Sequence, residues 1–318
     1  MKRRDFLMMG AVAATSVTAV RRGWAQARND DKLSRIAIMM FGLNNIVKTN
    51  MPAAPERTLE LMDIGQFSAD HFKVHNVELQ SNYFPSTEMS WLKDFKSRLD
   101  KTNTKVVQIN LEFGAGYNMG AESPSGRLQM IDLHRSWLDK AAFLGSPRVL
   151  LNQGQPTQEN KALITSNYQA VVALAKAKGI TAASENRNAG GGRGAAAAAA
   201  AGQPGAQTPA AAVPPPPPAP PATPSYILLT EILKASGTSS CVDFLNFPNA
   251  EEQLAGIRDM LPITSGLVHA GMRHDLVPAM KILRDQGYKG LYAIKAIGLP
   301  GDPIANTQKI IEGVLANM

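Results

Sequence analysis

Short apolar runs alternate with longer amphipathic stretches along most of the chain. The runs have the length and the Val, Ile and Leu content of buried strands, and the stretches between them repeat apolar residues at the helical period. Strands are predicted at 35–40, 76–80, 105–112, 148–153, 180–186, 241–246, 266–271 and 290–296. Helices are predicted between and after them, at 56–72, 86–101, 129–145, 165–179, 226–237, 250–261, 275–287 and 302–318.

This alternation indicates a parallel sheet, because each strand is followed by a helix that can carry the chain back to the start of the next strand. Eight such units favour closure into a (β/α)8 TIM barrel. An open, doubly wound sheet is the alternative, but no G-x-G-x-x-G motif follows the first predicted strand.

The segment 188–224 differs from the rest of the chain in composition. Gly, Ala and Pro dominate it, and its proline run favours extended polyproline II, so we expect a disordered insertion. It follows the fifth predicted strand and therefore leaves from the end of the barrel where TIM-barrel active sites lie. The position is consistent with a lid or with a passive extension, and the composition favours the passive extension.

The first 27 residues have the features of an export signal. A basic start precedes a weakly apolar run, and Ala25-Gln26-Ala27 matches an A-x-A cleavage site. Arg3-Arg4 followed by Asp5-Phe6-Leu7 resembles the twin-arginine signal, which predicts export by the twin-arginine machinery to the periplasm. An uncleaved membrane anchor is the alternative, although the run is shorter than the ~20 residues of a bilayer span.

Removal of the signal and the insertion leaves 254 residues, close to the ~250 of a typical TIM barrel. We therefore expect one domain over 28–318, interrupted at 188–224, with no stable membrane insertion after signal cleavage. The net charge of +7 falls to +3 without the signal, because residues 1–22 hold five cations and one acid. An excess of this size without a dense basic run does not predict nucleic-acid binding.

Polar residues at the ends of consecutive predicted strands carry the candidate chemistry. Glu185 lies on the fifth strand, Asp243 on the sixth, His269 on the seventh and Lys295 on the eighth. Because side chains alternate along a strand, apolar neighbours can face the helices while these four face the barrel axis. Two carboxylates and an imidazole at a barrel mouth could hold a divalent metal such as Mn, Mg, Co or Zn. Ordinary buried polar groups with satisfied hydrogen bonds are the alternative.

Six stretches of the chain share a characteristic order and spacing. They are HNVELQSNYFPS, WLDKAAFLGSPRVLLNQG, KGITAASENRN, VDFLNFPN, GLVHAG and GYKGLYAIKAIG. Together they resemble the sugar phosphate isomerase/epimerase family of xylose-isomerase-like barrels, over all of the chain after the signal except the insertion. The resemblance implies a metal held by Glu185, Asp243, His269 and a second Glu on the eighth strand.

At the position of that second Glu, this chain has Lys295. Two carboxylates, a neutral His and an ammonium carry the same net charge as three carboxylates, a neutral His and a divalent ion. Lys295 could therefore replace the ion, and its repulsion would lower the affinity for a metal. Arg187 and Gly271-Met272 are further departures from the family pattern, whereas Asn246 fits a position that contacts a substrate hydroxyl.

The resemblance implies an exported isomerase, epimerase or lyase that acts on a carbohydrate or polyol by proton transfer next to a carbonyl. Glu185 would be the base, and Lys295 the general acid, a second base or a Schiff-base lysine. The alternative is a non-catalytic carbohydrate-binding or interaction barrel in which Lys295 forms a structural ion pair. Too few metal ligands and the absence of a basic groove-lining run count against a nucleic-acid repair role. Substrate contacts are expected from Asn246, Arg187 and Arg273.

Overall fold

The computed structural model describes residues 31–48, 56–114, 116–187 and 225–318. The export signal predicted at 1–27 and the insertion predicted at 188–224 lie outside these ranges. On either side of the insertion the barrel continues, from β5 (Thr181–Glu185) to α7 (Ser225–Ser236). Within the described ranges, no helix has the length and apolar character needed to cross a membrane.

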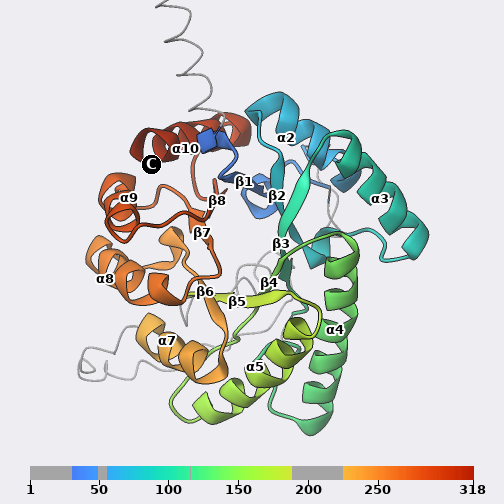
Figure 1. The fold of residues 1–318 in the computed structure, drawn as a ribbon, viewed down its shortest axis with the longest axis vertical. Helices are drawn as coiled ribbons and strands as arrows, with labels where there is room; N and C mark the ends of the chain where they lie inside the picture. The colour runs from blue at the N-terminus through green and yellow to red at the C-terminus, as the bar shows by residue number, and fades with distance from the viewer. Residues whose placement is uncertain (1–30, 49–55, 115, 188–224) are drawn as a thin grey trace, which may run out of the picture.

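Parallel strands form the centre of the molecule (Figure 1). They are hydrogen-bonded in the order β6-β5-β4-β3-β2-β1-β8-β7, which is the expected order of a TIM barrel. The ring closes between the segments of β6 and β7, the two ends of this order. There Ser265 N donates to Ser240 O (2.8 Å) and His269 N donates to Val242 O (2.8 Å). The strands are β1 (Ile36–Met39), β2 (Asn76–Gln80), β3 (Lys105–Leu111), β4 (Arg148–Leu151), β5, β6 (Ser239–Cys241), β7 (Leu267–Ala270) and β8 (Leu291–Ile294).

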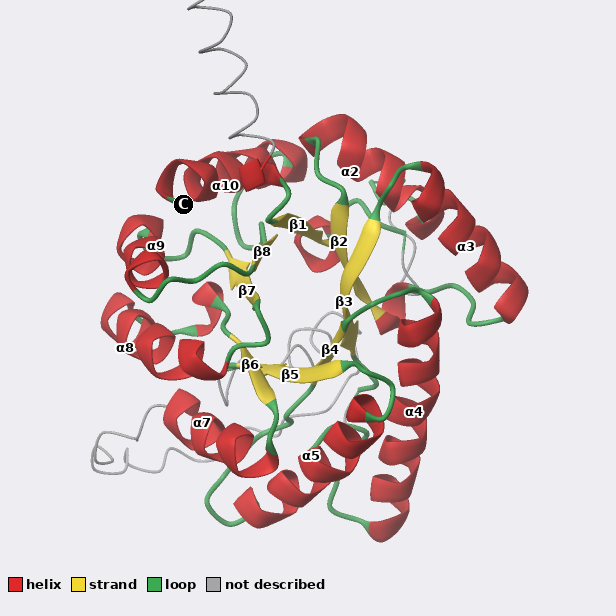
Figure 2. Ribbon diagram, in the orientation of Figure 1, coloured by secondary structure: helices red, strands yellow, loops and turns green. Residues whose placement is uncertain are grey.

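Helices surround this ring of strands (Figure 2). They are α2 (Ile64–Phe72), α3 (Met89–Lys101), α4 (Pro124–Phe143), α5 (Lys161–Lys176), α7, α8 (Ala250–Met260), α9 (Leu276–Asp285) and α10 (Pro303–Asn317). Short 3-10 turns occur at η1 (Met40–Leu43), η2 (Leu61–Asp63), η3 (Ser81–Tyr83), η4 (Phe244–Asn246) and η5 (Leu261–Ile263). The predicted TIM barrel is therefore confirmed.

Each strand separates two apolar layers, because successive side chains point to opposite faces. On β5, Ala182 belongs to the large cluster packed against the helices, and Ala183 to a smaller cluster inside the barrel. The inner cluster also contains small or unbranched side chains such as Ala37 and Met39, which fill the barrel interior. The polar site described below involves the inward positions that follow, toward the carboxyl ends of the strands.

Several predicted element boundaries were wrong. The first helix was predicted at 56–72, but α2 begins at Ile64, after the 3-10 turn η2. The sixth strand was predicted at 241–246, but β6 ends at Cys241. Beyond it the Asp243 side chain accepts a hydrogen bond from Leu245 N (2.8 Å), which caps η4 and turns the chain away from the sheet. Helix α4 begins at Pro124 and not near 129, because Ser123 caps it by accepting from Gly126 N and proline suits the first helical position.

Candidate active site at the carboxyl ends of the strands

The last four strands bring Glu185, Asp243, His269 and Lys295 together, as the sequence predicted. Glu185 is the last residue of β5, and His269 lies within β7. Asp243 follows β6 and forms a parallel bridge with His269, while Lys295 follows β8 directly. All four are at most 2% exposed. Parallel strands end at the same edge of a barrel, and this shared edge makes the four side chains neighbours.

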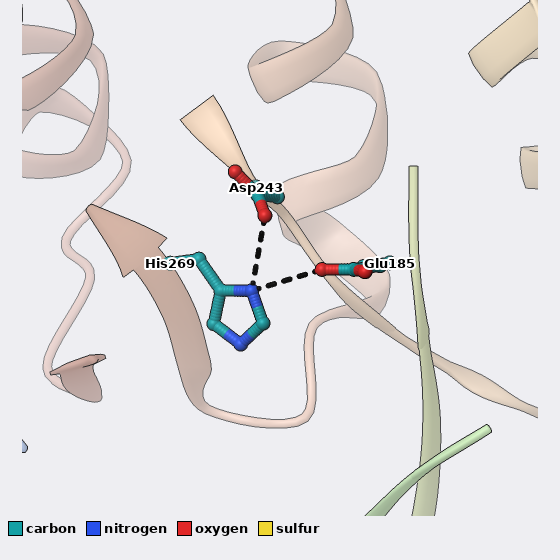
Figure 3. A group of neighbouring side chains, drawn as sticks. All are labelled: Glu185, Asp243 and His269. Carbon is teal, nitrogen blue, oxygen red and sulfur yellow. Dashed lines mark hydrogen bonds and ion pairs between the residues drawn. The ribbon is translucent and has the colours of Figure 1, made fainter. Parts of the chain in front are cut away.

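One ring nitrogen of His269 faces two carboxylates, those of Glu185 and Asp243 (Figure 3). Its Nδ1 is 3.1 Å from Glu185 Oε2 and 3.2 Å from Asp243 Oδ2. The Lys295 ammonium forms an ion pair with the same Asp243 Oδ2 and lies 3.7 Å from Glu185 Oε2. Lys295 and His269 therefore share one pair of carboxylate oxygens.

Glu78 on β2 is a further member of this cluster, beyond the four side chains predicted from the sequence. Its side chain is fully buried, and its Oε2 is 3.0 Å from His269 Nε2. Both ring nitrogens of His269 thus face carboxylates. The available signal was a single acidic residue inside the apolar strand NVELQ, which requires a partner when it is buried.

These contacts favour the charged imidazole. Burial alone lowers the pKa of His269, but the Glu78 carboxylate and the hydrogen bond to Asp243 hold that pKa well above 6.5. Cys241 is also close, but burial raises the pKa of its thiol and keeps it neutral, so we assign the effect on His269 to the carboxylates. A protonated His269 offsets the negative charge that Glu78 adds.

Arg187 connects the cluster to the ends of β3 and β4. Its Nε donates to Glu185 Oε1 (2.5 Å), and its Nη2 forms an ion pair with Glu112. Asn152 donates to the other oxygen of Glu112 (2.9 Å). Burial by itself lowers the pKa of Arg187, but Glu112 and Glu185 outweigh it and raise that pKa. Arg187 therefore holds two carboxylates in place as a permanent cation.

Close backbone contacts set the position of Lys295. A Cβ on Gly271, just after β7, would lie 2.8 Å from Lys295 O and 2.7 Å from Leu245 Cδ1. In η1, a Cβ on Gly42 would lie 2.9 Å from the backbone N of Ala296, the residue after Lys295. Only glycine allows these segments to approach the end of β8 so closely.

Asp243 is held with similar precision. Its backbone N donates to Asn186 Oδ1 (2.7 Å), and Asn186 Nδ2 donates back to Asp243 O (3.1 Å). These paired bonds join the ends of β5 and β6 and fix the Asp243 backbone next to Glu185.

No protein-family profile and no curated protein sequence matches the chain, but many solved structures share its architecture. D-allulose 3-epimerase from Methylomonas sp. has a TM-score of 0.63 at 13% identity, covering 89% of this chain and 98% of that one. A sugar phosphate isomerase/epimerase from Parabacteroides distasonis has 0.59 at 13% identity, covering 89% and 94%. A xylose isomerase domain protein from Planctomyces limnophilus has 0.58 at 11% identity, covering 89% and 95%.

The chain has the fold of these sugar isomerases and epimerases. At such identities the likeness shows the TIM-barrel fold, and residue roles depend on the geometry of this chain.

The buried group of Glu185, Asp243 and His269 could bind a metal ion. Their ligand atoms lie within 4.8 Å of one another, and carboxylate oxygens with an imidazole nitrogen suit a divalent cation. However, Lys295 Nζ contacts one of the same oxygens, and coordination through His269 Nδ1 would require loss of the proton favoured there. A metal ion and the Lys295 ammonium would thus compete for the same carboxylate oxygen, Asp243 Oδ2.

The other predicted substrate residues lie at the rim. Asn246 ends η4 and is half-buried, and Arg273 is exposed with its Nη1 donating to Leu245 O (3.1 Å). Neither contacts the four central side chains in any described interaction. His71 and His75 are exposed near the amino end of β2, and His134 is buried in α4, so these three lie apart from the cluster.

Proposed function

We propose that this protein is a sugar isomerase or epimerase-like enzyme that moves a proton at a carbon next to a carbonyl of a carbohydrate. The observation that carries the proposal is the convergence of Glu185, Asp243, His269 and Lys295 at one edge of the barrel. The fold shared with sugar epimerases supports the choice of substrate class.

Glu185 is the base in this proposal. It takes the proton from carbon, and the electron pair of that C–H bond moves toward the carbonyl to form an enediolate. Lys295, 3.7 Å from Glu185 Oε2, stabilises the negative oxygen and returns a proton from its ammonium to the intermediate. Solvent then restores both groups. A lyase outcome, in which the intermediate expels a leaving group, uses the same first step.

Asp243 and His269 hold Lys295 and Glu185 for this step. Asp243 Oδ2 accepts from both Lys295 and His269, while Arg187 holds the other oxygen of Glu185. A divalent metal at Glu185, Asp243 and His269 would polarise the substrate carbonyl, but we propose that Lys295 replaces it and lowers metal affinity. No step assigned here passes through a metal.

Substrate contact is proposed for Arg187 inside the barrel and for Asn246 and Arg273 at the rim. Asn246 and Arg273 both lie on segments that follow the strands of the cluster, η4 after β6 and the loop after β7. They are therefore placed to meet a ligand that approaches the barrel from this side.

We also propose that residues 1–27 direct export by the twin-arginine machinery to the periplasm. The paired arginines, the apolar run and the A-x-A site support this proposal.

The test is solvent exchange. The purified protein is incubated in D2O with a panel of ketopentoses and ketohexoses, and loss of the proton next to the carbonyl is followed by NMR. We expect exchange with at least one sugar, which persists in EDTA and is lost in Glu185→Gln. Glu312→Gln, at an exposed glutamate of α10, is the control for loss of a negative charge. No exchange with any sugar would reject the enzymatic proposal.

The buried ion pair of Lys295 with Asp243 favours a second candidate, a non-catalytic carbohydrate-binding barrel. In that case sugars bind without proton exchange, and Lys295 contributes only to stability.

A further inference from the structure

Two buried oxygens in the barrel interior next to the candidate site have no partner among the residues that the structure describes. Gln108 and Asn110 lie two residues apart on β3 and are both 0% exposed. Gln108 Oε1 and Asn110 Oδ1 accept no hydrogen bond within the part of the chain that the structure describes. A buried amide oxygen left unpaired costs about 1–3 kcal/mol, so a native protein seldom keeps two of them together without a reason.

Both side chains point into the barrel. Ile109 and Leu111, their neighbours on β3, pack in the outer cluster against the helices, so alternation turns Gln108 and Asn110 inward. Gln108 Nε2 reaches Cys241 Sγ on β6 (3.8 Å), which places its amide inside the ring of strands.

The same face continues onto β2. Register pairs Gln108 with Glu78 and Asn110 with Gln80, and Asn110 Nδ2 donates to Gln80 Oε1 (3.3 Å). We call Gln80, Gln108 and Asn110 the amide face. Glu78 joins this face to the candidate site through His269, 3.0 Å away.

A second connection between the amide face and the candidate site lies at the carboxyl end of β3. Glu112 follows Asn110 by two residues and pairs with Arg187, which holds Glu185. The amide face is therefore connected to the proposed base from two directions.

We propose that the amide face binds hydroxyl groups of an uncharged polyol chain, with hydroxyls donating to Asn110 Oδ1 and Gln108 Oε1. This inference rests on the proposed function, because it names the half of the site that holds the part of the substrate remote from the carbonyl. A hydroxyl both donates and accepts, so it satisfies these amides in either orientation of their oxygen and nitrogen atoms.

The surrounding charges favour an uncharged ligand over a phosphorylated one. Unpaired amide oxygens repel an anion, and the nearby cations Arg187 and Lys295 already form ion pairs with carboxylates. A phosphate would have to displace those partners at a desolvation cost, whereas a hydroxyl requires no change in charge.

The test measures binding of xylitol and sorbitol by calorimetry, since neither polyol has a carbonyl that could react. We expect Asn110→Leu to weaken binding at least about tenfold, the effect of one lost hydrogen bond of ordinary strength. Its thermal unfolding midpoint should change little, because the substitution removes a buried unsatisfied oxygen but also the donor to Gln80 Oε1. Gln108→Met, which keeps the length of the side chain, should behave in the same way.

Asn167→Leu is the matched control. Asn167 is also buried, but its Nδ2 donates to Met119 O (2.8 Å) outside the barrel interior. The same substitution there should lower the unfolding midpoint and leave polyol affinity unchanged.

Three outcomes separate this inference from the proposed function. Polyol binding that is lost in Asn110→Leu, in a protein without proton exchange, would support the amide face and reject the enzyme. Proton exchange together with polyol affinity equal in wild type and Asn110→Leu would overturn the amide face alone, and the two oxygens would then hold buried waters. Absence of saturable binding of either polyol to wild type would also overturn it.

Discussion

The ammonium of Lys295 pairs with Asp243 through the carboxylate oxygen that also faces His269 Nδ1, 3.2 Å away. One oxygen thus serves two cationic donors in a fully buried site. Where a metal would need Asp243 Oδ2, Glu185 Oε2 and His269 Nδ1, the ammonium already contacts the first and lies 3.7 Å from the second. Metal binding and the charge of Lys295 are therefore opposed.

Lys295→Glu should create a divalent-metal site. The substitution removes the competing cation and adds a carboxylate beside the three ligands, so affinity for Mn²⁺ should rise by at least about tenfold in titration calorimetry. Lys289→Glu makes the same charge change at an exposed position and should have no effect. Equal Mn²⁺ affinity in wild type and Lys295→Glu would show that the four side chains do not converge as described.

Lys295→Met should destabilise the protein. Removal of one partner leaves Asp243 as an uncompensated buried charge, which typically costs about 3–5 kcal/mol of unfolding free energy. The double variant Lys295→Met with Asp243→Asn should recover part of this loss in urea denaturation. A single variant as stable as wild type would mean that the ion pair contributes nothing to folding.

The lowered pKa of buried His134 should make the free energy of unfolding decrease in mild acid. Burial lowers its pKa from 6.5 to about 4, against a smaller opposing effect of the bond to Met130 O. The unfolded chain takes up a proton below pH 6.5, while the folded protein keeps His134 neutral down to about pH 4. Unfolding free energy should therefore decrease by up to about 3 kcal/mol as pH falls through that window.

The variant His134→Asn keeps a donor for Met130 O but cannot titrate. Denaturation at a series of pH values should show the difference in stability between wild type and variant shrink or reverse as pH falls below 6.5. A constant difference between pH 7 and about pH 4 would contradict the assignment.

Gly271→Ala should disturb Lys295 without touching a charged group. The added Cβ would meet Lys295 O at 2.8 Å and Leu245 Cδ1 at 2.7 Å, so the end of β8 must shift. We expect loss of at least about 1 kcal/mol of stability together with lower proton-exchange activity. Gly313→Ala in α10 meets only the flexible end of Leu276 and should be neutral or stabilising.

Export should depend on the two arginines near the start of the chain. Arg3→Lys with Arg4→Lys keeps the charge but removes the pair that the twin-arginine machinery reads, so the precursor should remain in the cytoplasm. Cell fractionation locates the protein, and mass spectrometry shows whether the signal has been cleaved. The change Arg21→Lys with Arg22→Lys is the control, and periplasmic protein from the first variant would argue against this route.

The barrel could be predicted because its signals are local. Apolar runs of strand length and amphipathic stretches of helical period reveal the order of elements, and eight such units suffice for closure. The same logic places Glu185, Asp243, His269 and Lys295 at one edge, because parallel strands end together. The sixth strand was the exception, since Asp243 uses its side chain to cap η4 and ends the pairing early.

The sequence by itself therefore determined the fold and four members of the site. Only the tertiary structure decided the partners: Glu78 lies against His269 Nε2, and Arg187 lies between Glu185 and Glu112. It also left two amide oxygens on β3 with no donor in the described part of the chain. Those contacts cross the barrel between residues as far apart as 78 and 269. They depend on the register and closure of the whole ring, which no local pattern of hydrophobic and polar residues specifies.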